Sequence, residues 1–486
     1  MIKRPILLFI ALTLLFSLNT VLISGQVTIG SAIEPRDGAL LDLTQGTVTT
    51  KGLGLPCVAL NRLTVSPGKS LAQTIDGRNN ADNWNRYDHV GLLVYNIGSF
   101  CINKGVYVWS GTKWEQILQK QKEDALFSPN SYIVIPGTFS LEIPVEKAFR
   151  VWEYYGSSEG NNRLPSETVT GTLTPVLYWQ DAPIIVTTPT ITGDTREDKI
   201  VVSISPVAPK GNAVIALKDR SNTIRWSWHI WMTDDPTSAN LDGNGYIWMD
   251  RYLGATSVTP ADVGTIGLTY QWGRKDPFPR STVWANVEPT LQNSHGEGVT
   301  AVVKSTVLSN RQTNFKTAIS SPITFIKSGS YSNYDWYSTN QTTTAERWDW
   351  RWDRTEEGCF RKTPVDPCPK GWRVPDWIYE NNTATTSPWV GLDKTNGGTF
   401  NYGFDWTTAN GASGEFGFYA GAGYRNSSTG DLALVSAVNG PGTFCNVWTA
   451  TSYLTNIYTL EFSISIVQTA YRKNRSSGYY VRCVRE

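Results

Sequence analysis

The chain has 486 residues and an almost balanced charge, with 43 Lys and Arg against 42 Asp and Glu. This length allows about three domains, and the balanced charge provides no global field that would favour nucleic acid or an anionic membrane surface. Of the 20 tryptophans, 15 lie from Trp226 onward. The composition therefore excludes a general polyanion-binding protein and indicates a change of character in the second half of the chain.

Residues 1–25 are typical of a secretory signal peptide. Two basic residues precede an apolar run from Ile6 to Phe16, and the small residues Ser24 and Gly25 follow. This order favours cleavage on export, here before Gln26. The alternative is an uncleaved membrane anchor, which the polar residues late in the segment argue against. We expect a secreted protein at the cell surface, associated with the outer membrane, with no membrane span after cleavage.

Residues 26–117 are expected to form a small β-rich module. Apolar residues flank the turn-like sequence Ser110-Gly111-Thr112, a pattern that predicts a β-hairpin. Residues 27–117 resemble a module at the N-terminus of many exported proteins of Bacteroidetes-type bacteria and of phage tail-fibre-like proteins. The resemblance implies presentation or assembly, including self-assembly through this module. The alternative is a small β-rich domain without a separate role.

A polar linker and a β-sandwich are expected next. Residues 118–128 contain the polar run Gln119–Asp124 and are predicted to be a linker. Residues 129–219 contain short β-favouring runs separated by turn residues, which predicts an Ig-like β-sandwich that acts as a stalk. The runs are 131–135, 138–143, 176–179, 199–204 and 213–217.

A tryptophan-rich strand is expected at the start of the remaining segment, residues 220–486. In a strand, the run from Trp226 to Trp231 places Trp226 and Trp228 on one face and His229 on the other. Such a stripe is most often core. We therefore expect His229 to be a packed structural residue and not a catalytic base.

Several ordered motifs lie in this segment. They are Tyr270–Lys275, Cys368–Pro375, Tyr419–Arg425, Val447–Thr451 and Val481–Arg485. Together they resemble the Fibrobacter succinogenes major paralogous domain, which is similar to C-type-lectin-like and formylglycine-generating-enzyme-like folds. The resemblance implies an α+β C-terminal domain, and helix-start residues predict a short helix directly after the second motif. The expected fold class is mainly β, with a small β-rich module, an Ig-like sandwich and a disulfide-stapled lectin-like domain.

Six cysteines are present, and an even number in an exported chain is compatible with three disulfides in any of 15 pairings. The cysteines are Cys57, Cys101, Cys359, Cys368, Cys445 and Cys483. Position along the chain favours pairing within two groups, Cys57 with Cys101 and the four C-terminal cysteines among themselves. Within the second group we expect Cys368 to pair with Cys483 and Cys359 with Cys445. The absence of Cys-x-x-Cys and the presence of only three histidines argue against a zinc site.

The cofactor prediction is none, with calcium as the alternative. Asp234, Asp235 and the run Asp242–Gly245 supply hard oxygen ligands on a turn. The chelating Glu of an EF-hand is missing, so a plain Asx turn is favoured.

No catalytic constellation is evident, and the predicted protein is not an enzyme. Carboxylates are abundant, but two of them must meet in space before glycosidic chemistry exists, and one sequence cannot sort them. The cysteines of the C-terminal segment are better explained as structural than as the reactive pair of a formylglycine-generating enzyme.

The candidate binding surface is the triplet Trp348, Trp350 and Trp352, whose indoles alternate with charged residues. A strand would place all three indoles on one face. Burial of these indoles is the favoured interpretation, and an exposed aromatic ridge that binds a ligand is the functional alternative.

These patterns together predict a non-catalytic, exported adhesion protein. Its C-terminal module would bind a glycan or a protein ligand on another surface, and nucleic acid is not an expected partner. The alternative is a structural or fibre-associated assembly component, and the second alternative is an enzyme related to the formylglycine-generating fold.

Overall fold

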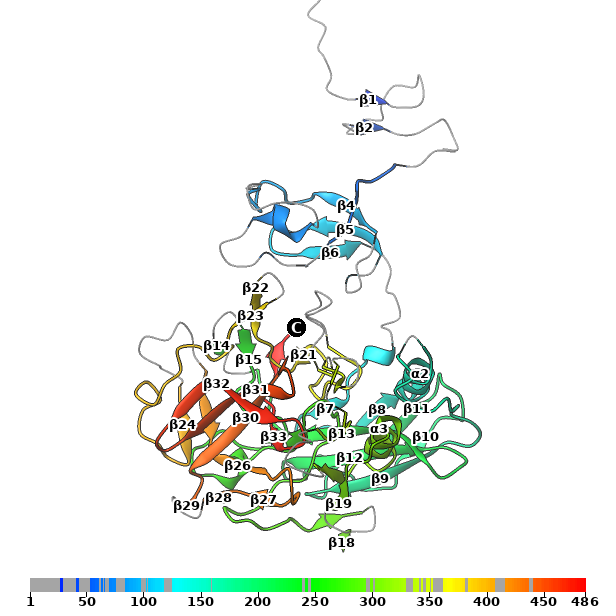
Figure 1. Cartoon of the computed structure of the whole chain (residues 1–486). Coiled ribbons are helices and arrows are strands. Elements are labelled where there is room, and N and C mark those ends of the chain that lie inside the picture. Colours follow the sequence, from blue (N-terminus) through cyan, green and yellow to red (C-terminus); the bar gives the residue numbers. More distant parts are fainter. Residues whose placement is uncertain are drawn as a thin grey trace, which may run out of the picture. The chain divides into compact units, whose positions relative to one another are not determined.

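The computed structural model divides the chain into two compact units (Figure 1). The small unit comprises residues 1–97 and 104–117, and the large unit comprises residues 98–103 and 118–486. The structure describes residues 27–28, 41–42, 53–60, 63, 65, 70–75, 84–97, 102, 104–117, 125–158, 160–237, 241–243, 246–293, 298–299, 302–328, 335–340, 342–343, 347–349, 351–352, 362–380, 383–406, 416–436 and 440–486. The predicted signal peptide lies outside these residues.

The small unit is built on a four-stranded sheet in the order β3–β4–β5–β6. Strands β4, β5 and β6 are antiparallel neighbours, and β3 runs parallel to β4. The strands are β3 (Cys57–Val58), β4 (Leu93–Asn96), β5 (Gly105–Trp109) and β6 (Trp114–Ile117). The unit also contains a parallel pair, β1 (Val27–Thr28) and β2 (Leu41–Asp42), and a short 3-10 helix, η1 (Leu71–Thr74).

A six-stranded mixed sheet lies at the centre of the large unit, in the order β18–β17–β9–β12–β13–β7. Its strands are β7 (Ser131–Val134), β9 (Thr174–Gln180), β12 (Gly211–Lys218), β13 (Ile224–Met232), β17 (Leu291–Gln292) and β18 (Gly298–Val299). Every residue of β13 is buried, so the tryptophan-rich strand predicted from the sequence exists and has core on both faces.

Two helices pack against β13. They are α2 (Glu146–Tyr155) and α3 (Arg311–Ser320). The buried residues Ala148, Val151, Trp152 and Tyr155 recur every three or four positions, which gives α2 one apolar face. Helix α3 begins after Asn310, whose side chain caps it by accepting a hydrogen bond from the Thr313 amide.

The large unit also contains two smaller sheets. One has the order β10–β11–β8, and the other is the parallel pair β19–β20. The elements are β8 (Ser140–Pro144), β10 (Thr190–Ile191), β11 (Lys199–Ser203), β19 (Val303–Thr306), β20 (Thr324–Lys327) and the 3-10 helix η2 (Ala125–Phe127).

The last third of the chain supplies most of a seven-stranded sheet, in the order β16–β33–β26–β30–β31–β32 with β27 paired to β26. These strands are β16 (Thr269–Gln271), β26 (Ala422–Arg425), β27 (Leu432–Ala433), β30 (Phe444–Tyr453), β31 (Asn456–Ser463), β32 (Val467–Asn474) and β33 (Gly478–Tyr480).

Short sheets complete the large unit. A four-stranded sheet has the order β14–β15–β34–β21, and three two-stranded pairs accompany it. The elements are β14 (Leu241–Gly243), β15 (Tyr246–Trp248), β21 (Trp372–Arg373), β34 (Val484–Arg485), β22 (Ile378–Glu380), β23 (Thr383–Thr386), β24 (Gly403–Asp405), β25 (Phe418–Ala420), β28 (Val435–Ser436), β29 (Gly440–Pro441) and the 3-10 helix η3 (Val263–Thr265).

The domain boundary expected between residues 219 and 220 is not a boundary in the structure. It falls in the turn between β12 and β13, which are paired along their length. Two hydrogen bonds also join the expected sandwich to the C-terminal segment. The Ser131 hydroxyl donates to the Pro367 carbonyl (2.6 Å), and the Asn130 side-chain amide donates to the Asp366 carbonyl (2.7 Å). One hydrophobic core runs from Leu126 to Cys483. The strands assigned to a separate sandwich are therefore part of the large unit.

The predicted mainly β class is confirmed, with few helices and several open mixed sheets. The finer assignments, an Ig-like sandwich and a lectin-like domain, are not shown. Three of the expected sandwich strands, β7, β9 and β12, share one sheet with β13, β17 and β18, which come from beyond residue 219. The short helix expected after the Cys368 motif is instead strand β22. Among the described residues, no helix has the length and apolar character needed to cross a bilayer.

Candidate functional site

The hairpin of the small unit forms where the sequence predicted it. Strands β5 and β6 pair in antiparallel register around Ser110-Gly111-Thr112. The Ser110 hydroxyl oxygen accepts from the Lys113 amide (3.1 Å), and the Ser110 amide donates to the Lys113 carbonyl (2.9 Å). Gly111 has a φ of +97°, a conformation that disfavours a side chain. The turn chemistry therefore fixes the register of the two strands.

The inner face of this sheet is the core of the small unit. Val94, Tyr107, Trp109 and Trp114 are buried there, and the two indoles meet edge to face at 5.5 Å. The Trp114 indole N–H donates to the Thr74 hydroxyl (2.8 Å), which ties the sheet to η1. Burial of large side chains on this face leaves the other face of each strand pointing outward.

The outer face carries two rows of side chains across the strands. Paired residues of neighbouring strands point to the same side of a sheet. Tyr95 and Ile117 are 38% and 36% exposed, and Leu93 is 37% exposed. The register gives one row with Cys57, Tyr95, Val106 and Ile117, and a second row with Leu93, Val108 and Glu115. We call these seven residues the outer face.

Trp348 and Trp352 of the tryptophan triplet are buried, which agrees with the favoured interpretation of the sequence and not with an exposed ridge. Trp348 is 3% exposed and Trp352 is 2% exposed, and Trp350 lies outside the described residues. Trp348 packs edge to face against Phe315 at 5.0 Å, while the Trp352 indole N–H donates to the Val365 carbonyl (3.0 Å). Arg347 is helical and Trp348 and Asp349 lie in a turn, so the alternation expected of a strand does not apply.

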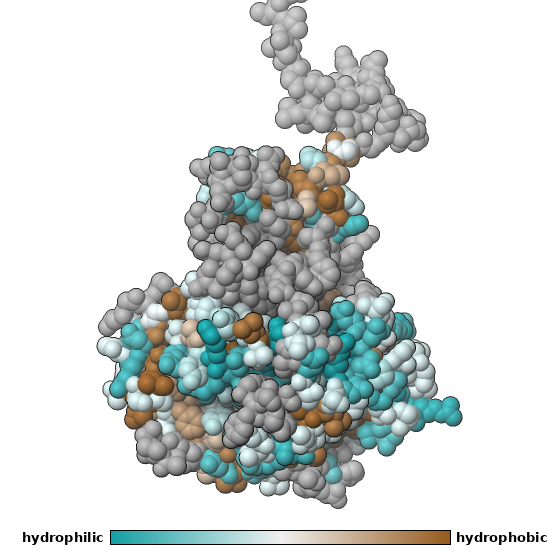
Figure 2. Space-filling model, viewed as in Figure 1, coloured by the Kyte–Doolittle hydropathy of each residue, from teal (hydrophilic) through white to brown (hydrophobic). Residues whose placement is uncertain are grey.

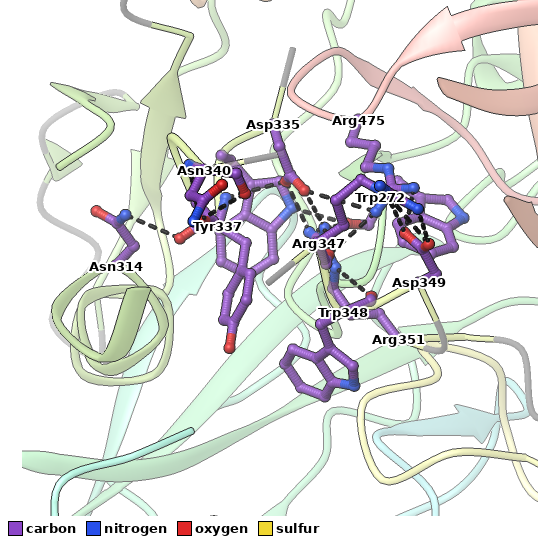
Figure 3. A network of polar contacts seen from close by, with 12 residues as sticks. Trp272, Asn314, Asp335, Tyr337, Asn340, Arg347, Trp348, Asp349, Arg351 and Arg475 are labelled. Carbon is purple, nitrogen blue, oxygen red and sulfur yellow. Dashed lines mark hydrogen bonds and ion pairs between the residues drawn. The ribbon is translucent and has the colours of Figure 1, made fainter. Parts of the chain in front are cut away.

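The charged residues between these tryptophans belong to a buried ionic network (Figure 3). Arg351 donates to Asp335 through both terminal guanidinium nitrogens, and the Oδ1 contact is 2.8 Å. Asp335 and Arg351 have fully buried side chains. The structure buries Asp349 and Arg351 together with their ionic partners.

Arg475 joins the same network from the loop between β32 and β33. One of its guanidinium nitrogens lies 3.7 Å from Asp335, and another lies 2.5 Å from Asp349. Asp349 also binds Arg347 at 2.9 Å. Burial lowers the pKa of Arg475, and Asp335 and Asp349 oppose that shift. We infer a structural role, because three guanidinium groups and two carboxylates satisfy one another away from solvent.

His229 is a packed structural residue, as predicted. Its Nδ1 lies 3.1 Å from the Ser131 hydroxyl and its Nε2 lies 3.0 Å from the Asn212 side-chain oxygen. Burial lowers the pKa of His229 to about 3, because the charged imidazolium would lose its hydration. The imidazole is therefore neutral at physiological pH.

The predicted disulfide between Cys368 and Cys483 is confirmed, with a Cα–Cα distance of 6.1 Å. The predicted disulfides of Cys57 and of Cys445 are wrong. Cys57 is an exposed free cysteine and Cys445 is a buried free cysteine. Their expected partners, Cys101 and Cys359, lie outside the described residues. Burial raises the pKa of the Cys445 thiol to about 12.

Asp234 and Asp235, which the sequence offered as metal ligands, have protein partners, and Asp234 pairs with Lys210. Asp235 accepts from the Thr237 amide (2.8 Å) and hydroxyl, which is the Asx turn favoured from the sequence. Asp366 accepts from the Cys368 amide (2.8 Å) and binds Lys362 (3.0 Å). Within the described residues, no group of three His, Cys, Asp or Glu side chains could hold a metal ion.

One comparison with known proteins bears on the small unit. Residues 28–128 match the family described as a phage tail like trimerisation region. No curated protein and no solved structure matches the chain. The matched range includes the whole β3–β6 sheet and its outer face.

The comparison corrects the resemblance assigned to the C-terminal segment. The Fibrobacter succinogenes major paralogous domain, with its lectin-like and formylglycine-generating relatives, is wrong for this chain, because the family match lies at residues 28–128. The resemblance of residues 27–117 to phage tail-fibre-like proteins agrees with that match. Ordered short motifs rich in Gly and Trp were insufficient evidence for a family.

Proposed function

We propose that this protein is a structural component of a fibre-like or surface assembly, in which residues 28–128 hold three copies together. The observation that carries the proposal is the match of these residues to a phage tail like trimerisation region. A region that trimerises would present three copies of the large unit from one assembly. The large unit is suited to such a role because it has an extensive apolar core and a disulfide of its own.

Export to the cell surface remains part of the proposal. The Cys368–Cys483 disulfide is compatible with an oxidising compartment. The predicted leader at residues 1–25 supports the same location. Subcellular fractionation of the producing cell, with an antibody against the large unit, would test it. Recovery of the chain from the cytoplasm alone would contradict export.

The residues that the sequence offered as a glycan-binding surface do not support that function. Trp348 and Trp352 are buried, so neither can stack on a sugar face. A surface that contacts ligands elsewhere on the large unit stays a prediction. The structural alternative has the support of the family match, and we therefore place it first.

Size-exclusion chromatography with light scattering tests the proposed function directly. We expect the whole chain to have about three times the 53.9 kDa mass of one chain. A matched chain that spans residues 118–486 keeps the large unit except for its segment 98–103 and should have the mass of a monomer. A monomeric whole chain at every concentration would contradict trimerisation, and a trimeric 118–486 chain would move the contact out of residues 28–117.

A further inference from the structure

The outer face of the small unit has an unusual composition for the solvent side of a sheet. An antiparallel sheet that packs one face on a core normally presents polar residues on its other face. Here the inner face is occupied by the aromatic core, and Leu93, Tyr95 and Ile117 remain exposed on the outer one. Glu115 is the one charged residue among the seven of this face.

The exposed apolar residues are neighbours and not scattered. Tyr95 pairs with Val106, and Val106 pairs with Ile117, so their side chains lie side by side across three strands. Leu93 pairs with Val108 in the next row. Contiguous apolar surface of this kind marks an interaction site, whereas single exposed apolar residues do not. Figure 2 shows hydrophobic surface on the small unit beside the parts drawn in grey.

Charged residues lie at one border of this surface. Lys113 and Glu115 are 3.7 Å apart and both are solvent-exposed. An apolar centre with a polar border is the usual arrangement of a protein–protein interface.

We infer that the outer face is the surface through which the copies of this chain contact one another in the trimer. The occupant is a second copy of the chain, because the same strands lie in the range that matches a trimerisation region. This inference rests on the proposed function and adds the residues that form the contact. Tyr95 is at the centre of the first row, with β3 on one side and β5 on the other, and is therefore expected to contribute most.

Three variants of the whole chain test the contact. Tyr95→Glu places a charge in the centre of the face, and the concentration at which half of the chains are assembled should rise about tenfold or more. Tyr95→Phe keeps the aromatic ring and should assemble as the original chain does. Phe139→Glu is the matched control, because it makes the same kind of change at an aromatic residue of the large unit that is 72% exposed.

Cys57 provides a second measurement that needs no substitution on the face. Its exposed thiol belongs to the same row as Tyr95. In the unmodified chain, alkylation of Cys57 by a maleimide should be slow in the trimer and should become faster as dilution dissociates it. Peptide mapping by mass spectrometry would assign the modified cysteine.

The outcomes separate this inference from the proposed function. A trimer that loses assembly with Tyr95→Glu but not with Phe139→Glu, and that protects Cys57, supports both. A trimer that tolerates Tyr95→Glu and leaves Cys57 equally reactive at all dilutions overturns the contact surface and leaves trimerisation standing. A whole chain that is monomeric overturns both. If Tyr95→Glu fails to fold, the alkylation of Cys57 in the unmodified chain tests the contact surface alone. Slow alkylation in the trimer supports the surface, and equal alkylation at all dilutions overturns it.

Discussion

At the scale of single residues, the large unit buries a network of ionic groups. The fully buried pair of Asp335 and Arg351 is the clearest case, and Arg475 lies 3.7 Å from the same carboxylate. Charges taken out of water are tolerated only when each has a partner and hydrogen bonds. Removal of one member should therefore cost more than removal of an exposed ion pair.

Asp335→Ala should destabilise the large unit by about 3–5 kcal/mol, because it leaves Arg351 buried without its carboxylate. Urea unfolding monitored by tryptophan fluorescence would measure the change. The matched control is Glu142→Ala, which removes an exposed pair with Lys199 and should cost less than about 1 kcal/mol. Equal shifts of the two variants would refute a structural role of the network.

His229 should make folding stability depend on pH. Its pKa is lowered to about 3 in the folded protein from an ordinary value of 6.5, so the unfolded chain binds the proton first as pH falls. The stabilisation is complete above pH 6.5 and is lost between there and pH 3, by about 1.4 kcal/mol per pH unit.

Unfolding free energies of the original chain and of His229→Gln, measured over that pH range, would test this dependence. The variant will be less stable throughout, because it loses packing and hydrogen bonds. Its curve should nevertheless be flatter than that of the original chain. Parallel curves for the two proteins would show that His229 does not carry the effect.

At the scale of elements, local sequence patterns predicted where several strands form. They did not predict which strands pair with one another in a sheet. The β5–β6 hairpin was predictable because Ser110-Gly111-Thr112 encodes its own turn. Strand β13 was predictable from its alternating aromatic residues. Its pairing in parallel with β7, almost a hundred positions earlier, has no local signal. That long-range pairing is why the expected boundary at residue 219 failed.

Only part of the candidate site could be predicted from the sequence. The hairpin was predicted from neighbouring residues, and the assembly module from the resemblance of residues 27–117 to tail-fibre-like proteins. It did not identify the outer face, because that surface requires the register of four strands, including β3 beside β4. The burial of Trp348 and Trp352 was the favoured interpretation of the sequence, but the common face was not found, because alternation at 348–352 predicts a shared face only if a strand forms.

Gly111→Ala should destabilise the small unit by about 1–2 kcal/mol. A Cβ at this position, with φ of +97°, would be strained and would lie 3.1 Å from the Val90 side chain. Hydrogen exchange of the β5 and β6 amides would report the loss of protection. Gly54→Ala is the matched control, because a Cβ there meets nothing within 4 Å. Unchanged exchange in Gly111→Ala would contradict the proposed importance of this turn.

The Cys368–Cys483 disulfide joins positions 115 residues apart. Replacing both cysteines by serine should cost the large unit about 4–5 kcal/mol, because a long loop is no longer closed in the unfolded chain. Chemical unfolding without reductant would measure the loss. Cys57→Ser should leave the midpoint of the large unit unchanged, because Cys57 is a free cysteine of the small unit. An unaltered midpoint in the double variant would be inconsistent with the bridge.

At the scale of the whole molecule, the chain combines a small unit with an apolar outer face and a large unit with an extensive core of its own. The large unit also has the Cys368–Cys483 disulfide. Each unit therefore has a distinct role in the proposed assembly. The arrangement also explains why motifs in the large unit gave no reliable guide to function, since residues such as Trp352 serve its packing.

The number of chains in the assembly is the most direct test of this account. Two versions of the whole chain that differ only in a small mass tag would be co-expressed, and the purified assembly examined by native mass spectrometry. Trimerisation predicts four equally spaced masses, from all-light to all-heavy, each close to three chain masses. Two masses, each of one chain, would contradict the central claim, and three masses would show a dimer instead.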